Sequence, residues 1–223
     1  MFTGIIQAIG TLEGREPRGG DVRLWVRAEG LPLAEASPGD SIATNGVCLT
    51  VVELTTDGYA ADVSNESLAL TTLGGLQPGA PLNLETALTL RTPLGGHLVS
   101  GHVDGIGEVL ERRSDGRSVR FTLEAPAALA RYIAAKGSIC VDGASLTVNR
   151  VEGSRFQLNV VPHTLEQTIM AGYRAGTRVN LEVDLVARYL ERLLLGERAA
   201  EPDAGSGVTL ELLARSGFLK HGS

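Results

Sequence analysis

The stretch SIATNGVCLTV at residues 41–51 is the most informative part of the sequence, because it returns as SICVDGASLTV at residues 138–148. The two stretches lie 97 residues apart, and the same shift aligns residues 1–88 with residues 98–185 without a gap. This alignment has 23 identities in 88 positions, whereas unrelated chains of ordinary composition match at about 6 in 100. The chain therefore contains one module written twice, and a repeat of this kind sets the architecture.

Each copy has the pattern of a small β-protein. Short segments rich in Val, Leu and Thr alternate with Gly and Pro, which is typical of strands joined by tight turns. Several short strands in so few residues remove their exposed edges best by closing into a barrel. We therefore expect an all-β protein with two similar barrels in tandem, over residues 1–97 and 98–185. Strands are expected in the first copy at residues 22–28, 47–54, 59–64 and 82–86.

Helical signals are few. A short helix is expected at residues 126–135, where Pro126 can open the first turn and Gly137 can close the last. A second helix is expected over residues 186–196, capped by Asp184 and ended by Gly196. Its apolar residues share one face, which either packs back on the barrels or, as we favour, packs against copies of itself. These residues are Val186, Tyr189, Leu190, Leu193 and Leu194.

The tail at residues 197–223 belongs to neither copy. Residues 198–207 have the composition of a linker, and residues 209–218 have the pattern of another short helix. No function is predicted for this segment.

Composition excludes several classes of protein. The formal net charge is -6 and the basic residues form no long run, so a nucleic acid is a poor partner. No apolar stretch approaches the roughly 20 residues of a membrane helix, and no signal peptide is visible after Met1, so we expect a soluble, cytoplasmic protein without membrane contact. Cys48 and Cys140 have no zinc-type spacing, and a disulfide is not expected in a reducing compartment.

The two copies differ at a few polar positions, and any chemistry that treats two bound molecules differently must come from them. Each has an ordinary explanation: a cysteine in a strand is often a small buried apolar group, and a cation near a helix end is favoured by the helix dipole. His97 and His102 bracket Gly101, where they either satisfy backbone groups or transfer protons near neutral pH. The unlike pairs are Cys48 and Ser145, Ile5 and His102, Glu66 and His163, and Gly39 and Lys136.

Four segments in this order resemble the riboflavin synthase family over about residues 1–195. They are the opening MFTGII at residues 1–6, NGVCLTV at residues 45–51, GGHLVSGH at residues 95–102, and DGASLTV at residues 142–148. The resemblance implies two six-stranded Greek-key barrels and a C-terminal helix through which three chains associate. It also implies a site formed between the N-terminal barrel of one chain and the C-terminal barrel of its neighbour.

The implied reaction is a dismutation of two 6,7-dimethyl-8-ribityllumazine molecules, in which one gives a four-carbon unit to the other. Its products are riboflavin and a ribitylamino-pyrimidinedione, and no metal, flavin or nicotinamide cofactor is required. Lumazine synthase is a partner that the resemblance brings into consideration. His102 is the preferred proton shuttle, while Cys48, Ser41 and Thr50 would polarise the ring or guide addition at C7. His97 is a further acid-base candidate, and Phe2 would pack against a ring face.

Family positions transferred to this sequence give two groups of substrate-binding residues. The first group comprises Gly4, Ile5, Ile6, Cys48, Leu49, Thr50, Asp62, Val63, Ser64, Asn65, Glu66 and Ser67. The second group comprises Gly101, His102, Val103, Lys136, Ser145, Leu146, Thr147, Asn159, Val160, Val161, Pro162, His163 and Thr164.

Two other functions fit parts of the pattern. The same fold serves lumazine or flavin carriers that act as light-emitting antennae and need only one good pocket. Here both copies keep a glycine followed by the Cys or Ser, Leu, Thr run, which favours the enzyme. A module for assembly alone would explain the duplication and the helix, but it leaves the polar differences between the copies unexplained.

Overall fold

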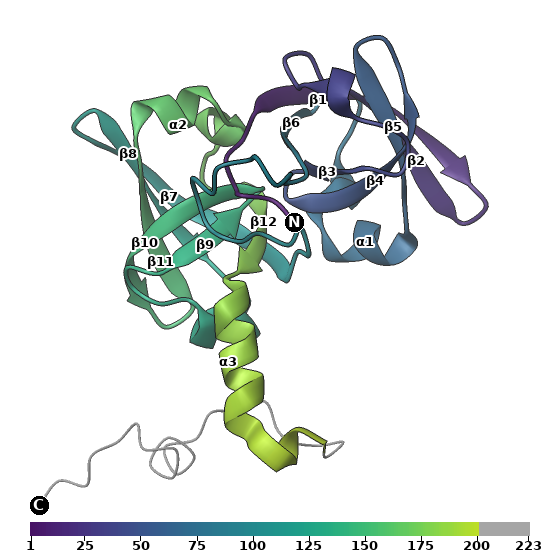
Figure 1. Ribbon diagram of the computed structural model, residues 1–223. Helices are drawn as coiled ribbons and strands as arrows, with labels where there is room; N and C mark the ends of the chain where they lie inside the picture. Colours follow the sequence, from purple (N-terminus) through teal and green to yellow (C-terminus); the bar gives the residue numbers. More distant parts are fainter. Residues whose placement is uncertain (201–223) are drawn as a thin grey trace, which may run out of the picture. The chain divides into compact units, whose positions relative to one another are not determined.

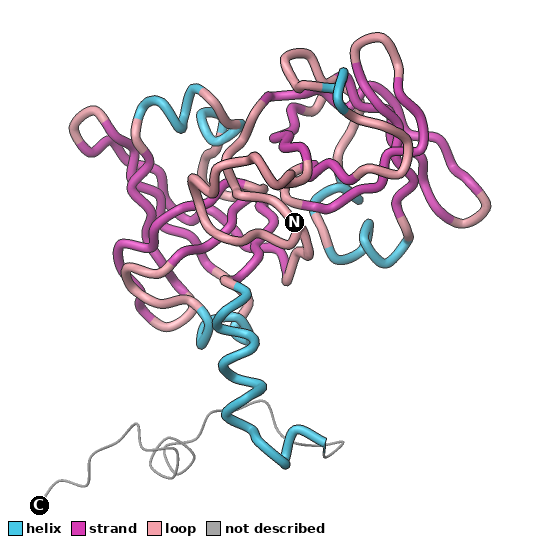
Figure 2. The backbone as a smooth tube through the Cα atoms, viewed as in Figure 1, coloured by secondary structure: helices cyan, strands magenta, loops and turns pink. Residues whose placement is uncertain are grey.

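The structure is a computed structural model that describes residues 1–200 (Figures 1 and 2). The chain divides into two compact units, Met1–Asp184 and the segment from Leu185 onward. The first unit contains two closed, six-stranded antiparallel barrels, and the second begins with a helix. The expected all-β fold with two tandem Greek-key barrels and a C-terminal helix is therefore confirmed.

The first barrel closes in the strand order β1-β2-β5-β4-β3-β6, so that three neighbouring pairs, β2 with β5, β3 with β6 and β1 with β6, are not consecutive in the chain. Side chains alternate across the strands, and those of Ile42, Leu49 and Val51 fill the interior. Helix α1 (Asn65–Leu70) and the 3-10 turns η1 (Leu33–Glu35) and η2 (Thr72–Gly75) lie between strands. The strands are β1 (Ala8–Arg18), β2 (Asp21–Arg27), β3 (Ser41–Thr44), β4 (Val47–Leu54), β5 (Gly58–Val63) and β6 (Pro81–Thr86).

The second barrel repeats this order six strands later, with β7-β8-β11-β10-β9-β12 closing in the same way. Its core contains Phe121 and Phe156, both buried, together with Tyr173, whose ring meets that of Phe121 edge-on. Burial of each large apolar side chain contributes about 1.5–3 kcal/mol. Its strands are β7 (Gly105–Asp115), β8 (Ser118–Glu124), β9 (Ser138–Val141), β10 (Ala144–Glu152), β11 (Arg155–Val160) and β12 (Arg178–Val183). Its helical segments are η3 (Ala127–Tyr132), α2 (Pro162–Glu166) and η4 (Ile169–Gly172).

The barrels meet along their two equivalent hairpin turns. A Cβ added to Gly46 would lie 2.7 Å from the backbone nitrogen of Gly143, so only glycine permits this approach. The side chain of Asn83 donates to the carbonyl of Asp142, and that of Asn180 donates to the carbonyl of Asn45, each at 2.8 Å. These reciprocal bonds hold the barrels together about a pseudo-twofold axis.

Two extended segments precede the barrels, and we call residues 1–6 the N-terminal strap and residues 97–103 the central strap. They pair with each other, because the N–H of Phe2 donates to the carbonyl of Val99 and the N–H of Val99 donates to that of Phe2. Phe2, Ala43, Val99 and Cys140 form a third apolar cluster outside both barrels. The straps therefore lie where the outer faces of the two barrels approach each other.

The expected strands of the first copy are found as β2, β4, β5 and β6, each within two residues of the predicted bounds. The helix expected at residues 126–135 is instead the shorter 3-10 segment η3, which begins after Pro126 as expected but already ends at Tyr132, with Ile133 as its C-cap.

The second unit begins with α3 (Leu185–Leu195), which confirms the helix expected there. Most of its apolar face is exposed, namely Val186, Tyr189, Leu190 and Leu193. The 3-10 turn η5 (Gly196–Ala200) follows, so the start of the expected linker at residues 198–207 is helical. The short helix expected at residues 209–218 lies outside the described residues.

Candidate functional site

The candidate residues of the first barrel share the outer face of one hairpin. Ser41 stands opposite Thr50 and Ala43 opposite Cys48 in the register of β3 and β4, and directly opposed side chains lie on the same face. Because Leu49 fills the barrel interior, its neighbours Cys48 and Thr50 point outward. The structure thus places Ser41, Cys48 and Thr50 on one face of this hairpin.

The straps connect each site to the opposite barrel. The carbonyl of Gly4 accepts the N–H of Ser145 in β10, and the carbonyl of Gly101 accepts the N–H of Cys48 in β4, both at 2.8 Å. Both glycines have positive φ, of 75° and 80°, and a Cβ on either would lie 2.6 Å from the Cβ of its partner. Only glycine therefore fits at these two positions.

A cavity of about 210 Å³ lies where the N-terminal strap meets the second barrel. Polar groups from Ser145, His163 and Thr164 face it, while Ile5 and Ile6 supply apolar surface. Such a mixture of apolar walls and a few polar groups is typical of a small-molecule site. The complete lining is Gly4, Ile5, Ile6, Ala144, Ser145, His163, Thr164, Gln167 and Thr168.

This arrangement differs from the grouping expected from the sequence. That grouping assigned Gly4, Ile5 and Ile6 to the site of Cys48, and Gly101, His102 and Val103 to the site of Ser145. The straps are exchanged instead, because each glycine carbonyl finds its N–H partner in the opposite barrel. The site beside Ser145 thus contains Ile5, and the central strap brings His102 to the site beside Cys48.

His97 adds an imidazole to the site beside Ser145. Its Nδ1 lies 2.6 Å from Oγ of Ser145. Burial lowers the pKa of His97, opposed by the negative charge of Asp184, so the imidazole is neutral at pH 7. Its buried Nε2 has no hydrogen-bond partner within residues 1–200, which is typical of a group that serves a ligand.

Cys48 is partly exposed and His102 is exposed, so both side chains are accessible. The Cys48 thiol is partly exposed and free, whereas Cys140 is buried and burial raises the pKa of its thiol well above the ordinary value. His102 is exposed on the central strap, and its N–H donates to the hydroxyl of Ser100 at 3.3 Å. The thiol available for chemistry is therefore that of Cys48.

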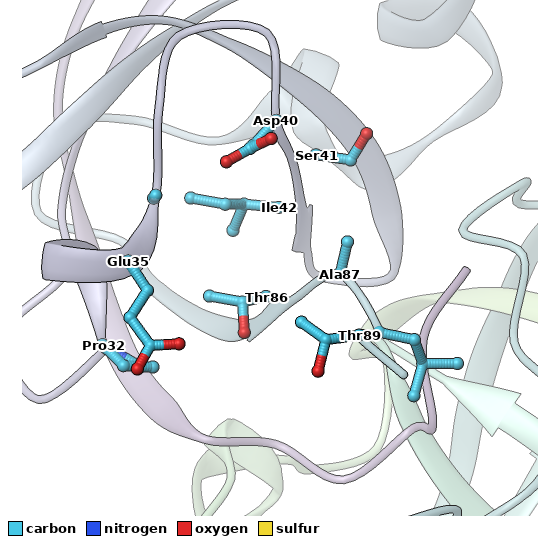
Figure 3. A pocket seen from close by; sticks show the side chains of 10 residues that line it. Pro32, Glu35, Asp40, Ser41, Ile42, Thr86, Ala87 and Thr89 are labelled. Carbon is cyan, nitrogen blue, oxygen red and sulfur yellow. The ribbon is translucent and has the colours of Figure 1, made fainter. Parts of the chain in front are cut away.

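Ser41 also lines a second cavity, of about 180 Å³, at the mouth of the first barrel (Figure 3). Asp40 and Ser41 lie on one side of this cavity and Glu35 and Thr86 on another. The second barrel fills the equivalent space, because its η3 segment carries larger side chains that pack on the core. These side chains are Leu129, Tyr132 and Ile133, in place of Pro32, Glu35 and Ala36.

Phe2 and Asp62 already have protein partners. Phe2 is completely buried in the cluster between the barrels, so packing on a bound ring would require that cluster to open. Arg23 binds both carboxylate oxygens of Asp62, at 2.6 and 2.9 Å, and this hydrogen bonding lowers the pKa of Asp62. In these positions Phe2 supports Gly101, and Asp62 joins β2 to β5.

The other predicted residues lie at the ends of equivalent strands. Ser64 caps α1 by accepting the N–H of Ser67, and Pro162 opens α2 directly after Val161. Val63 and Val160 are buried, whereas Asn65, Glu66 and Asn159 are exposed. Leu49 is buried, Leu146 is partly buried and packs against the core, and Val103 is partly buried. Thr147 is exposed at the position equivalent to Thr50.

Lys136 has an unusual backbone. Its φ is 68°, in the left-handed region that side chains with a Cβ rarely adopt, and the equivalent Gly39 has a φ of 100°. The exposed lysine therefore stands at a turn for which glycine is better suited. Strain of this kind is characteristic of functional positions.

The sequence did not point to Gln167 and Thr168, which also line the cavity beside Ser145. Thr168 had a signal, because it is identical to its counterpart Thr71 in the repeat. Within residues 1–200 no cluster of three His, Cys, Asp or Glu side chains could hold a metal ion. None of the helices in that range is long and apolar enough to span a bilayer.

The chain has two tandem barrels that exchange straps and carry unlike polar groups at equivalent positions. These features define a class of duplicated binding proteins with two sites. The lumazine binding domain family matches residues 3–87 and again residues 100–184. The riboflavin synthase of Photobacterium phosphoreum is 47% identical over 219 residues, which cover 98% of this chain and 100% of that protein. The riboflavin synthase of Bacillus subtilis (strain 168) is 36% identical over 218 residues, with the same two coverages.

A solved structure, LumP complexed with riboflavin, has the same fold. Its TM-score is 0.75 at 22% sequence identity, and the match covers 82% of this chain and 99% of that one. The chain belongs to the lumazine-binding family that includes these riboflavin synthases.

Proposed function

We propose that the chain catalyses the riboflavin synthase reaction, in which two molecules of 6,7-dimethyl-8-ribityllumazine give riboflavin and 5-amino-6-ribitylamino-pyrimidinedione. One lumazine transfers a four-carbon unit to the other, so the enzyme is a transferase whose donor and acceptor are the same compound. The reaction balances without an added oxidant or reductant. Similarity to riboflavin synthases over nearly the whole chain supports this function.

One structural observation carries the proposal: the same fold presents unlike groups to two equivalent sites. The first site has the thiol of Cys48 with His102 of the central strap, and the second has the hydroxyl of Ser145 with His97 and His163. A reaction between two copies of one compound requires such a difference, because one copy must lose what the other gains.

Orientation of the two rings supplies most of the acceleration in this mechanism, since holding two reactants in line replaces a collision in solution. His102 takes the proton from the acidic C7 methyl group of one lumazine, and His97 acts on the other through Ser145. Cys48, Ser41 and Thr50 polarise the ring at C7 or guide the nucleophile that adds there. The position of Ser41, Cys48 and Thr50 on one face of β3 and β4 supports the last of these roles.

Association of chains is part of the proposal. The exposed apolar face of α3 supports a homotrimer, in which the N-terminal barrel of one chain faces the C-terminal barrel of the next. The proposal also includes domain bounds at residues 97, 185 and 196. It further includes a cytoplasmic location and an association with lumazine synthase, which the resemblance supports.

The direct test incubates the purified full chain with the lumazine alone and follows riboflavin fluorescence. We expect turnover without any added cofactor, and we expect it to fall in Cys48→Ser and in His102→Gln. Circular dichroism of both variants checks the fold. Full activity in both variants would remove these two residues from the mechanism. A lumazine that stays bound without turnover would indicate a carrier, and no binding at all would indicate an assembly module.

A further inference from the structure

Two buried glutamates have no part in the chemistry described above. Glu85 in β6 and Glu182 in β12 are equivalent in the repeat, and they are only 2% and 4% exposed. Glutamate is almost never buried to this extent unless it is paired. Within residues 1–200 neither forms an ion pair, so their hydrogen-bond partners explain how they are accommodated.

Each carboxylate binds one strap through three hydrogen bonds. Oε1 of Glu85 accepts the N–H and the hydroxyl of Thr3, at 2.7 and 2.6 Å, and Oε2 accepts the N–H of Gly4 at 3.0 Å. Glu182 repeats this pattern with the N–H and hydroxyl of Ser100, both at 2.6 Å, and with the N–H of Gly101 at 2.9 Å. Hydrogen bonds to a charged acceptor are about twice as strong as those between neutral groups.

The residue held by each carboxylate is the one that reaches the opposite site. Gly4 is bound at its N–H by Glu85 and at its carbonyl by the N–H of Ser145. Gly101 is bound in the same way by Glu182 and by the N–H of Cys48. A single glycine therefore connects a buried glutamate of one barrel to the reactive strand of the other.

We propose, on the basis of the function proposed above, that Glu85 and Glu182 are positioning residues that act on the site of the opposite barrel. Glu182 fixes the central strap, and with it His102, against Cys48 of the first barrel. Glu85 fixes the N-terminal strap, and with it Ile5, against Ser145 of the second barrel. The connection runs through the glycine peptide between each pair.

An ionised carboxylate suits this task, since it accepts at both oxygens and donates at neither. A glutamine in its place would turn an NH2 group toward one of the strap N–H groups and lose that bond. Burial raises the pKa of both carboxyls, and the strap hydrogen bonds oppose this rise. The bonds to the strap therefore also stabilise the charge of each glutamate.

The exchange of backbone amides tests the proposal without any turnover. In the full chain, Glu182→Gln is expected to speed exchange of the Cys48 amide at least tenfold and to leave the Ser145 amide within twofold. Glu85→Gln is expected to do the reverse. A role confined to the sheet predicts the opposite result, in which Glu85→Gln speeds exchange of the Cys48 amide. The reason is that Glu85 pairs with Ala43, and Ala43 pairs with Cys48. Effects limited to the variant's own barrel, or equal at both amides, would overturn the proposal.

Kinetics supply the second measurement. Each glutamine variant is expected to lower kcat at least tenfold, with a smaller change in KM, because the strap no longer holds the site groups in line. Thr44→Val is the matched control, since it removes the buried hydrogen bond between Thr44 and Tyr59 and touches neither strap. If Thr44→Val lowered Tm and kcat as much as the glutamine variants do, the two glutamates would have a purely structural role.

Two milder variants keep the test decisive if a glutamine variant does not fold. Thr3→Val and Ser100→Ala each remove one of the three hydrogen bonds to the carboxylate and leave the carboxylate in place; each also removes the bond that the same hydroxyl accepts from the N–H of Ile5 or of His102. We expect Ser100→Ala to speed exchange at Cys48 and Thr3→Val to speed exchange at Ser145, each by a few fold. No change in either amide would contradict the proposal. The amide readout separates this failure from a failure of the proposed function, which the fluorescence assay reports.

Discussion

Nδ1 of His97 lies 2.6 Å from Oγ of Ser145, the residue that is equivalent to Cys48 in the repeat. The two side chains are coupled, because a buried neutral imidazole can accept the hydroxyl proton or hold that hydroxyl in place. We expect His97→Gln and Ser145→Ala each to lower kcat about 10- to 100-fold, within the range of general acid-base effects.

The double variant decides whether these residues act as one unit. If they do, it is no slower than the worse single variant. Riboflavin formation under saturating lumazine is the measurement, and Cys48→Ser serves as the reference from the other site. Independent, multiplying losses for His97 and Ser145 would contradict the coupling.

Replacement of Lys136 should lower the affinity for substrate without lowering the stability of the fold. Its left-handed backbone costs about 1–2 kcal/mol, and the equivalent position of the first copy is Gly39. We expect Lys136→Gly to keep the free energy of unfolding within about 1 kcal/mol of the parent, because relief of strain offsets the greater freedom of glycine in the unfolded chain. KM should rise at the same time. Denaturant unfolding and steady-state kinetics measure the two quantities, and an unchanged KM would remove Lys136 from the substrate site.

The buried carboxyl of Asp142 should make the free energy of unfolding depend on pH. Its buried carboxylate accepts the N–H of Asn180 at 2.7 Å and the hydroxyl of Tyr173, and burial raises its pKa from 3.8 to about 7. A raised pKa in the folded state means that the stability is complete below pH 3.8 and is lost as the pH rises toward about 7. Asp142 alone should contribute a slope of about -1.4 kcal/mol per pH unit within this window.

Asp142→Asn should remove that slope and stabilise the protein above neutral pH. The first copy shows that asparagine fits this turn, because Oδ1 of Asn45 accepts the N–H of Asn83 at 2.7 Å. The free energy of unfolding of both proteins, measured from pH 4 to 8, isolates this group from the other titrating carboxyls. Parallel curves would show that Asp142 stays ionised when it is buried.

From the exposed apolar face of helix α3 we predict that activity depends on assembly. Leu193→Asp places a charge on its exposed apolar face, where it would have to be desolvated in a helix contact. We expect the variant to sediment as a smaller species and to lose most of its turnover, while circular dichroism shows intact barrels. Arg192→Ala, one residue earlier and off this face, is the control. Full activity in a monomeric variant would contradict a site shared between chains.

The repeat made the fold predictable. A shift of 97 residues without a gap fixes two equal barrels, and the alternation around Leu49 places Cys48 and Thr50 on one outer face. The helix after Asp184 was equally clear, because five apolar residues share its face. The weaker signal at residues 126–135 gave only a 3-10 turn, since a proline and a glycine mark the ends of a segment without specifying its conformation.

The exchange of straps could not be predicted from the repeat. The alignment places Gly4 before Cys48 and Gly101 before Ser145, so each strap was assigned to the copy that contains it. Its true partner is set by long-range hydrogen bonds to Ser145 and Cys48, which leave no periodic trace in the sequence. The same holds for Phe2, whose burial depends on Val99 and Cys140 from distant parts of the chain.

The exchanged straps also constrain how the protein can change over generations. A substitution in the central strap changes the chain beside Cys48 of the first barrel although its codon lies in the second copy, and a substitution at Ile5 changes the cavity beside Ser145 of the second barrel. Replacing one half of the gene by a half from a distant relative would therefore mismatch both strap contacts in a single event. Neither copy can drift alone, and selection acts on the two halves as one inherited unit.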